Sequence, residues 1–198
     1  MQLAAIKRKK LTYQDYVQFP DDQRWEIIDG VAYAMSAPSR QHQRTLSRLA
    51  YVFSRYLDGK RCEVFFAPFD VRLSEYSDDA DDAENVVQPD LMVYCDEKGT
   101  DEKGGVAIPD LIVEILSPST ASTDKKRKFV LYEKFGAKEY WIVDGDKQFI
   151  EIYRLENGKF ESAGRYTSGS TLGSTVLKGF GLSVTEIFER REWQLNDN

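Results

Sequence analysis

The alternation of hydrophobic and polar positions predicts short strands interrupted by two substantial helices. Apolar residues at helical spacing predict a helix from Ser39 to Leu57, with Ser39 as its amino-terminal cap; they are Leu46, Leu49, Ala50, Phe53 and Leu57. A second helix is predicted from Asp124 to Phe135, because Gly136 follows as a typical stop. Thr12 followed by Asp15 resembles a capping box and predicts a short helix that ends before Pro20.

Turn residues between apolar runs predict several hairpins. Asp29-Gly30 separates the runs 24–28 and 31–35, and Asp-Gly is a strong two-residue turn signal. Further strands are predicted at 62–66, 69–73, 139–144, 148–155 and 159–166, with a loop at 167–175 and a short last helix at 184–192. The chain therefore predicts a mixed α/β (α+β) fold in one domain spanning 1–198, a length that suits a single core.

Two nearly continuous apolar runs, 86–94 and 106–116, predict central strands that are covered on both faces. They nearly repeat one another, because Pro89-Asp90-Leu91 in the first matches Pro109-Asp110-Leu111 in the second. The second run also holds Glu114 among apolar neighbours. An unpaired buried charge is costly, so a partner for Glu114 is expected.

Asp90 is the better partner for Glu114 within a shared metal site. Asp110 and Glu114 lie four residues apart on one strand, about 13 Å along it, which is too far for two ligands of one ion. If the strand that follows Asp90 is the neighbour of the strand that holds Glu114, Asp90 lies within about one strand spacing of 5 Å from the Glu114 backbone. The alternative is that Asp90 only caps a strand turn and Glu114 pairs with a lysine.

The amino-acid composition limits the kinds of site and the cellular location that are expected. The 198 residues are 41% hydrophobic and 13% aromatic, which excludes a disordered chain, and no apolar run approaches the roughly 20 residues that span a bilayer. The basic cluster 7–10 is not followed by an apolar signal core, so a cytoplasmic location is predicted. Cys62 and Cys95 lack C-x-x-C partners and are predicted to be buried reduced thiols. The single histidine, His42, excludes a multi-histidine zinc site.

The net charge of the chain bears on whether it binds nucleic acid. The chain carries a formal charge of -6, and much of the acidic excess lies in the predicted loop 75–84. This balance counts mildly against a general nucleic-acid binder.

The predicted helix 124–135 supplies a lysine aimed at the core. At 100° per residue, Lys128 falls on the apolar face, whereas Lys126 and Arg127 point away and Lys125 lies at the edge. A snorkelling lysine, or a pair with Asp124, is the plainer alternative. Two carboxylates with one lysine suit metal-assisted phosphodiester hydrolysis, and oxygen ligands favour Mg²⁺ or Mn²⁺ over zinc.

The ordered set of motifs resembles a large bacterial family of restriction-endonuclease-like proteins, within the PD-(D/E)xK nuclease superfamily. The motifs are Trp25-Glu26-Ile27-Ile28-Asp29-Gly30, His42 after Pro38-Ser39, Pro89-Asp90, 113–120, the Asp124/Lys128/Tyr132/Gly136 spacing and Glu139-Tyr140-Trp141-Ile142-Val143-Asp144. The resemblance covers about 11–188. It implies a restriction-endonuclease-like core, with a mixed central sheet flanked by helices, an N-terminal hairpin and a C-terminal β extension.

The resemblance also implies roles for individual residues. Asp90 and Glu114 are implied metal ligands, with the carbonyl of Ile115 as a possible third. Leu116 stands where the nuclease motif has lysine, so the lysine is implied to have moved to the following helix. Lys128 fits that position, and Lys125 is its competitor.

Three further residues are weaker candidates. Glu26 is an additional metal carboxylate or one that supports a metal ligand, or else a cross-strand partner of Arg24 or Arg44. His42 orients substrate or a ligand, or is a plain helix residue, and Asp70 faces the same cleft only if the sheet register allows. Tyr132 and Trp141 are predicted to be core aromatics.

Three functional hypotheses follow. The first is a Mg²⁺- or Mn²⁺-dependent nuclease that cuts DNA. The second is a non-catalytic module that keeps the fold to bind nucleic acid or protein, and a metal-dependent phosphoesterase on small substrates is a third reading. A homodimer is expected, because C2 dimers are the commonest oligomers.

Overall fold

The computed structural model describes residues 10–117 and 123–189, with side chains of the second range described from Lys126 onward. Its centre is a six-stranded mixed sheet in the order β12-β11-β10-β9-β6-β3. The strands are β3 (Glu63–Phe66), β6 (Leu91–Tyr94), β9 (Leu111–Ile115), β10 (Glu139–Asp144), β11 (Phe149–Glu156) and β12 (Lys159–Thr167). β9 and β10 run parallel, whereas β6 is antiparallel to both β9 and β3.

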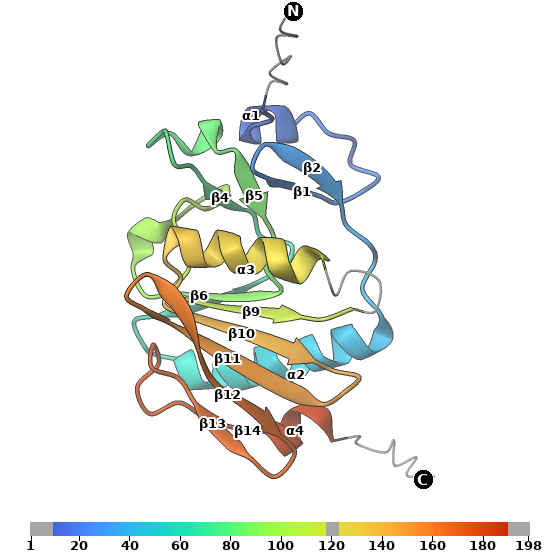
Figure 1. Cartoon of the computed structure of the whole chain (residues 1–198), viewed down its shortest axis with the longest axis vertical. Coiled ribbons are helices and arrows are strands. Elements are labelled where there is room, and N and C mark those ends of the chain that lie inside the picture. The colour runs from blue at the N-terminus through green and yellow to red at the C-terminus, as the bar shows by residue number, and fades with distance from the viewer. Residues whose placement is uncertain (1–9, 118–122, 190–198) are drawn as a thin grey trace, which may run out of the picture.

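Helices cover both faces of this central sheet (Figure 1). α2 (Arg40–Leu57) packs Leu49 and Phe53 against one face, and α3 (Thr123–Phe135) packs Leu131 and Tyr132 against the other. The two faces alternate along β6, where Leu91 and Val93 point toward α2 and Met92 points toward α3. The central strands are therefore apolar on both sides, as their continuous apolar runs predicted.

A second six-stranded sheet, in the order β2-β1-β5-β4-β8-β7, stacks beside the first at the N-terminal end of the molecule (Figure 1). Its strands are β1 (Trp25–Ile28), β2 (Val31–Ala34), β4 (Val71–Leu73), β5 (Asn85–Val87), β7 (Thr100–Asp101) and β8 (Gly104–Gly105). The β1–β2 hairpin turns through Asp29 and Gly30, both at positive φ, as the Asp-Gly signal predicted. α1 (Tyr13–Tyr16) begins with the expected capping box of Thr12 and Asp15.

The smaller elements complete the chain. There are two short 3-10 turns: η1 (Ala80–Asp82) lies between β4 and β5 of the second sheet, and η2 (Glu97–Gly99) lies between β6 of the central sheet and β7 of the second. β13 (Thr171–Gly173) and β14 (Gly181–Ser183) form a two-stranded sheet, and α4 (Val184–Phe188) follows them. The segment 167–175 was predicted to be entirely loop, which is wrong because β13 lies within it. The last helix is also shorter than predicted, because Glu189 is no longer helical.

The prediction of single strands at 86–94 and 106–116 is wrong. The first run divides at Gln88-Pro89-Asp90 into β5 and β6, which belong to different sheets. The second run yields β9 only from Leu111, after the Pro109-Asp110 step. Proline has no N–H to give to a sheet, and in both runs the strand of the central sheet begins only after the Pro-Asp step.

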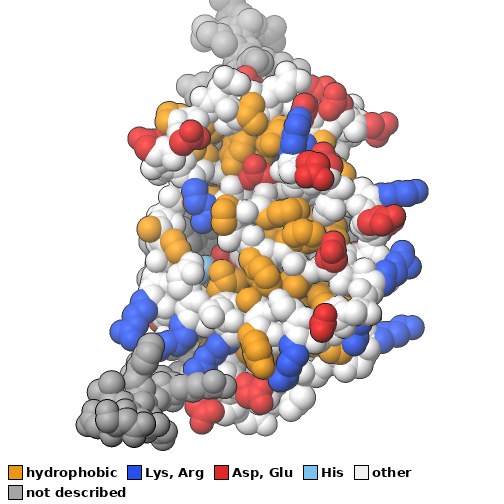
Figure 2. Space-filling model, turned by 180° about the vertical axis from the view of Figure 1, so that it is seen from behind, with side chains coloured by type: hydrophobic (Ala, Val, Ile, Leu, Met, Phe, Trp, Pro, Cys, Tyr) orange, Lys and Arg blue, Asp and Glu red, His pale blue; other side chains and the backbone are white. Residues whose placement is uncertain are grey.

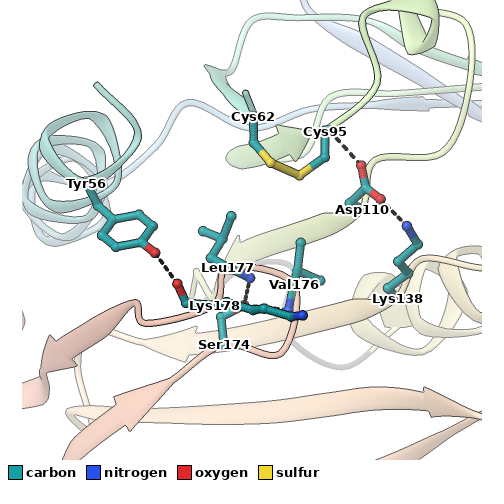
Figure 3. Close-up of a disulfide and its surroundings, with 9 residues drawn as sticks. All are labelled: Tyr56, Cys62, Cys95, Asp110, Lys138, Ser174, Val176, Leu177 and Lys178. Carbon is teal, nitrogen blue, oxygen red and sulfur yellow. Dashed lines mark hydrogen bonds and ion pairs between the residues drawn. A yellow bond between two sulfur atoms is a disulfide. The ribbon is translucent and has the colours of Figure 1, made fainter. Parts of the chain in front are cut away.

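The prediction of two reduced cysteines is also wrong, because Cys62 and Cys95 form a disulfide. Glu63 pairs with Tyr94 across β3 and β6, so the two cysteines stand opposite each other just beyond that pair. Figure 3 shows the disulfide beside Asp110 and Lys138. No helix in the described residues has the length and apolar character needed to cross a membrane.

Candidate active site

The candidate site lies where β6 begins and β9 ends. Leu91 pairs with Val113 across these antiparallel strands, which places Asp90 opposite Glu114. Residues in such positions on neighbouring strands have Cβ atoms about 5 Å apart. Both side chains line one cavity of about 230 Å³. The register therefore brings together the two carboxylates that the sequence paired.

Asp90 is held by a backbone and a side-chain donor. Its Oδ2 accepts the N–H of Ile115 at 2.7 Å and lies 3.1 Å from Nε2 of His42. His42 stands in the first turn of α2, where its own N–H is capped by Ser39. Burial lowers the pKa of His42, but the hydrogen bond and charge of Asp90 outweigh burial, so its pKa is raised. His42 thus orients Asp90 as a charge-assisted donor.

Glu114 is a carboxyl group whose pKa is shifted by its surroundings. Its Oε1 accepts hydrogen bonds from Nζ of Lys128 at 3.0 Å and from the hydroxyl of Tyr132 at 2.7 Å. Burial raises the pKa of Glu114; Lys128 opposes this, and the nearby Asp90 and Glu26 raise it further, to about 7. Burial, together with Asp90 and Glu26, therefore disfavours the charged form of Glu114 more than Lys128 favours it.

Lys128 stands between two carboxylates. Its Nζ lies 2.7 Å from Oε1 of Glu26 and 3.0 Å from Oε1 of Glu114, and the residue is only 7% exposed. Burial acts to lower the pKa of Lys128, but Glu114 and Glu26 hold it well above its ordinary value. Lys128 is consequently a cation at neutral pH and supplies charge and hydrogen bonds, rather than accepting a proton.

Glu26 joins the two large sheets at the site. It comes from β1 of the second sheet, and its Oε1 also accepts the N–H of Gln88 at 2.9 Å. The side chain of Gln88 then links Arg24 on one side to Tyr16 and Asp70 on the other. Glu26 is therefore not the cross-strand partner of Arg24 or Arg44 that the alternative reading supposed, because its partners are Lys128 and Gln88.

Six of the residues singled out from the sequence line the same cavity: Glu26, His42, Asp90, Glu114, Ile115 and Lys128. The side chain of Lys125 lies outside the described residues. Asp70 does not join the site, because it lines a separate cavity of about 250 Å³ with Gln88 and Lys103. Asp110 lies at the other end of β9, bound to the N–H of Cys95 at 2.8 Å.

Sequence reasoning missed two contributors to the site. Tyr132 is fully buried, as expected of a core aromatic, but its hydroxyl also holds Glu114. Its position four residues after Lys128, on one face of α3, was the available signal. Gln88 gave no such signal, because its contact with Glu26 spans 62 positions of the chain.

The donor groups of the site suit a hard divalent cation. Asp90, Glu114 and Ile115 line the same cavity, and oxygen ligands are those that Mg²⁺ and Mn²⁺ prefer. Across the described residues, no three His, Cys, Asp or Glu side chains are arranged as a ready-made metal cage. Mg²⁺ does not need one, because it keeps several waters and is bound through one or two carboxylates.

Comparisons with known proteins agree with this arrangement. Residues 13–185 match the model of the Uma2 family, described as a putative restriction endonuclease. The chain belongs to this family. A protein of Synechocystis sp. described as uncharacterized is 31% identical over 177 residues, covering 88% of each chain. A second uncharacterized protein of that organism is 28% identical over 160 residues, covering 78% of this chain and 84% of its own.

One solved structure shares the Uma2 chain's fold. It is a crystal structure from Anabaena variabilis, described as a putative nuclease belonging to DUF820. The TM-score is 0.72 at 19% sequence identity, and the match covers 90% of this chain and 97% of the other. The mixed α+β fold predicted from the sequence is confirmed by this match.

Proposed function

We propose that this chain is a Mg²⁺- or Mn²⁺-dependent nuclease that hydrolyses phosphodiester bonds in DNA. The observation that carries the proposal is the pairing of Asp90 and Glu114 at one wall of a cavity, with the cationic Lys128 against Glu114. Membership of the Uma2 family, described as a putative restriction endonuclease, supports the reaction class.

Each residue has a distinct part in this proposal. Asp90, Glu114 and the carbonyl of Ile115 hold the ion, which when bound polarises the phosphate and lowers the pKa of a water. His42 keeps Asp90 turned toward the cavity. Lys128 places a positive charge where the phosphate gains negative charge during attack, and Glu26 holds Lys128 there.

The test is metal-dependent cleavage of supercoiled plasmid by the purified protein with Mn²⁺, followed by gel electrophoresis. Wild-type protein is expected to nick or linearise the plasmid, and Glu114→Gln is expected to remove that activity because one ion ligand loses its charge. Equal cleavage by both proteins would show that Glu114 is not part of the reacting centre.

A non-catalytic binding module is the second candidate, and one contact favours it. The ion pairs of Lys128 with Glu26 and Glu114 already offset the charge of Glu114 without a metal. That reading predicts DNA or protein binding with no cleavage under any divalent cation. A homodimer and a cytoplasmic location stay predictions of the sequence.

A further inference from the structure

Positive charge is concentrated on one helix of an acidic chain. The whole sequence has 27 Lys and Arg against 33 Asp and Glu. α2 has the opposite charge, because its 18 residues include four arginines and no acidic residue. The solvated face of a helix ordinarily mixes both signs. A single-sign helix on an acidic protein therefore needs an explanation.

The four arginines form a stripe on the solvent side of α2. Arg40, Arg44, Arg48 and Arg55 fall within about 80° of one another at 100° per residue. The buried residues of the helix, among them Leu49 and Phe53, lie on the opposite side. Seen from behind, Lys and Arg side chains form a row across the lower part of the molecule, on the side that α2 covers, with acidic side chains below it (Figure 2). We call these four residues the arginine stripe.

The stripe carries an exposed aromatic ring and little competing charge. Tyr51 lies within it and is 63% exposed, and the guanidinium of Arg55 stands 5.3 Å from its ring centroid. Arg48 donates to the backbone oxygen of Glu186 at 2.7 Å, a contact that orients the side chain without neutralising it. No ion pair between a stripe arginine and a carboxylate is recorded among the described residues.

The stripe begins at the candidate site. His42 and Gln43, in the first turn of α2, line the site cavity, and Arg40 is the first residue of the same helix. From Arg40 to Arg55 the helix advances about 22 Å, at 1.5 Å per residue. One DNA strand carries a phosphate every 3.4 Å of its axis, so the stripe spans about six or seven base pairs.

We propose that the arginine stripe docks the phosphate backbone of duplex DNA to one side of the phosphate that enters the cavity. This inference rests on the proposed nuclease function for the identity of the polyanion. Guanidinium groups pair with phosphate oxygens in two-pronged fashion, and such contacts fix register without reading sequence. The acidic remainder of the surface repels DNA and leaves this face as the favoured approach.

The test is binding of a fluorescent 20-base-pair DNA duplex, measured by anisotropy at several salt concentrations in EDTA. The test variant is Arg44→Gln/Arg48→Gln/Arg55→Gln, which keeps helix-forming residues in place. The matched control is Lys98→Gln/Lys159→Gln/Arg165→Gln, which removes the same charge from other surfaces. Thermal melting checks that both variants are folded.

Each lost phosphate contact reduces the slope of log affinity against log salt by about 0.9, so the stripe variant should lose about 2.7 from its slope. If the two lines converge near 1 M salt, the variant binds ~500-fold more weakly near 0.1 M salt. The control variant should match the wild type. Equal slopes for wild type and stripe variant overturn the proposal. So does tighter binding of a duplex RNA, or stripe-dependent binding only to vesicles containing phosphatidylserine.

Failure of the stripe and failure of the nuclease function can be separated, because EDTA removes any metal-dependent step from the binding assay. Protein that binds DNA through the stripe but never cleaves it with Mn²⁺ keeps this inference and loses the proposed reaction. If the protein cleaves DNA but the stripe variant shows the same salt slope as the wild type, the proposed reaction is kept and this inference is lost.

Discussion

The same short sequence, Pro-Asp-Leu, begins two neighbouring strands, and its two copies lie at opposite ends of that strand pair. Asp90 precedes β6 and Asp110 precedes β9, and the two strands run antiparallel. Each aspartate accepts an N–H from the strand beside it, Asp90 from Ile115 and Asp110 from Cys95, at 2.7 and 2.8 Å. As local structure the two are equivalent, because each ties the start of its strand to the neighbouring strand.

Their surroundings make them different. Across from Asp90 stands Glu114, whereas the matching position across from Asp110 is Tyr94. The Asp90 end is enclosed by His42 and Lys128 in a cavity, but the Asp110 end is bound by Lys138, whose side chain is 70% exposed. A motif read from sequence is thus insufficient to mark a site, because the residues opposite it decide whether charge is concentrated there.

The largest contrast is expected in catalysis. Asp90→Asn should reduce the rate of Mn²⁺-dependent plasmid cleavage by about 10²-fold or more, because an ion ligand loses its charge. Asp110→Asn should keep the wild-type rate within about twofold, since its carboxylate lies at the other end of β9. Gel assays of initial rates compare the two, and an equal loss in both variants would abolish the distinction between the ends.

A second contrast concerns the lysines of the two ends. Lys128→Ala leaves Glu26 and Glu114 buried without their cation, and losing one partner of a buried pair costs about 3–5 kcal/mol. Lys138→Ala removes an exposed pair with Asp110, worth about 1 kcal/mol or less. Denaturant unfolding in EDTA measures both, and similar losses for the two variants would mean that the Lys128 pair is as solvated as the other.

The dependence of Mn²⁺ affinity on pH should arise from the Asp90 end alone. The pKa of Glu114, raised above its unfolded value to about 7, means that its proton is held in the folded state. A cation must displace that proton, so Mn²⁺ affinity should fall by about tenfold per unit as pH drops below 7.

The raised pKa of Glu114 also makes the stability of the folded protein depend on pH. The stability that the protonated Glu114 contributes is fully present below its unfolded pKa and is lost as pH rises through about 7. Metal-free wild type should therefore lose stability over that window relative to Glu114→Gln. Melting curves from pH 5 to 8 compare them, and parallel curves would place the pKa of Glu114 near its ordinary value.

The smallest effect tests the contribution of Tyr132. Tyr132→Phe removes the hydroxyl that donates to Glu114 but keeps the ring in the core, so it should cost about 1–2 kcal/mol of stability. It should also shift the pH midpoint of Mn²⁺ binding upward, because a donor to the charged carboxylate is lost. Tyr153→Phe, on a ring beside the same core with no contact to Glu114, serves as the control; an unshifted midpoint would limit Tyr132 to packing.

Much of this fold could be predicted from local sequence. The Asp29-Gly30 turn, the Ser39 cap and the inward face of α3 depend on neighbouring residues, and the structure confirms all three. The division of 86–94 between two sheets was not predictable from hydrophobic pattern, because residues on both sides of Pro89 are equally apolar. Only tertiary pairing determines which sheet receives each half.

Part of the candidate site could likewise be predicted from the sequence, and part could not. The placing of Asp90 beside Glu114 followed from one assumption, that their strands are neighbours, and the register bears that assumption out. The contacts of Lys128 with Glu26 and of Gln88 with Glu26 join segments far apart in the chain, so no local spacing revealed them. The disulfide was missed for the same reason, since the pairing of β3 with β6 brings its cysteines together.

Isothermal calorimetry of Mn²⁺ with metal-free protein at pH 7.5 tests most directly whether the Asp90 and Glu114 end is a cation site. Wild type and Asp110→Asn are predicted to bind the ion with the same affinity, and Glu114→Gln is predicted to lose that binding. Absence of binding by folded wild type, or equal binding by Glu114→Gln, would contradict the account.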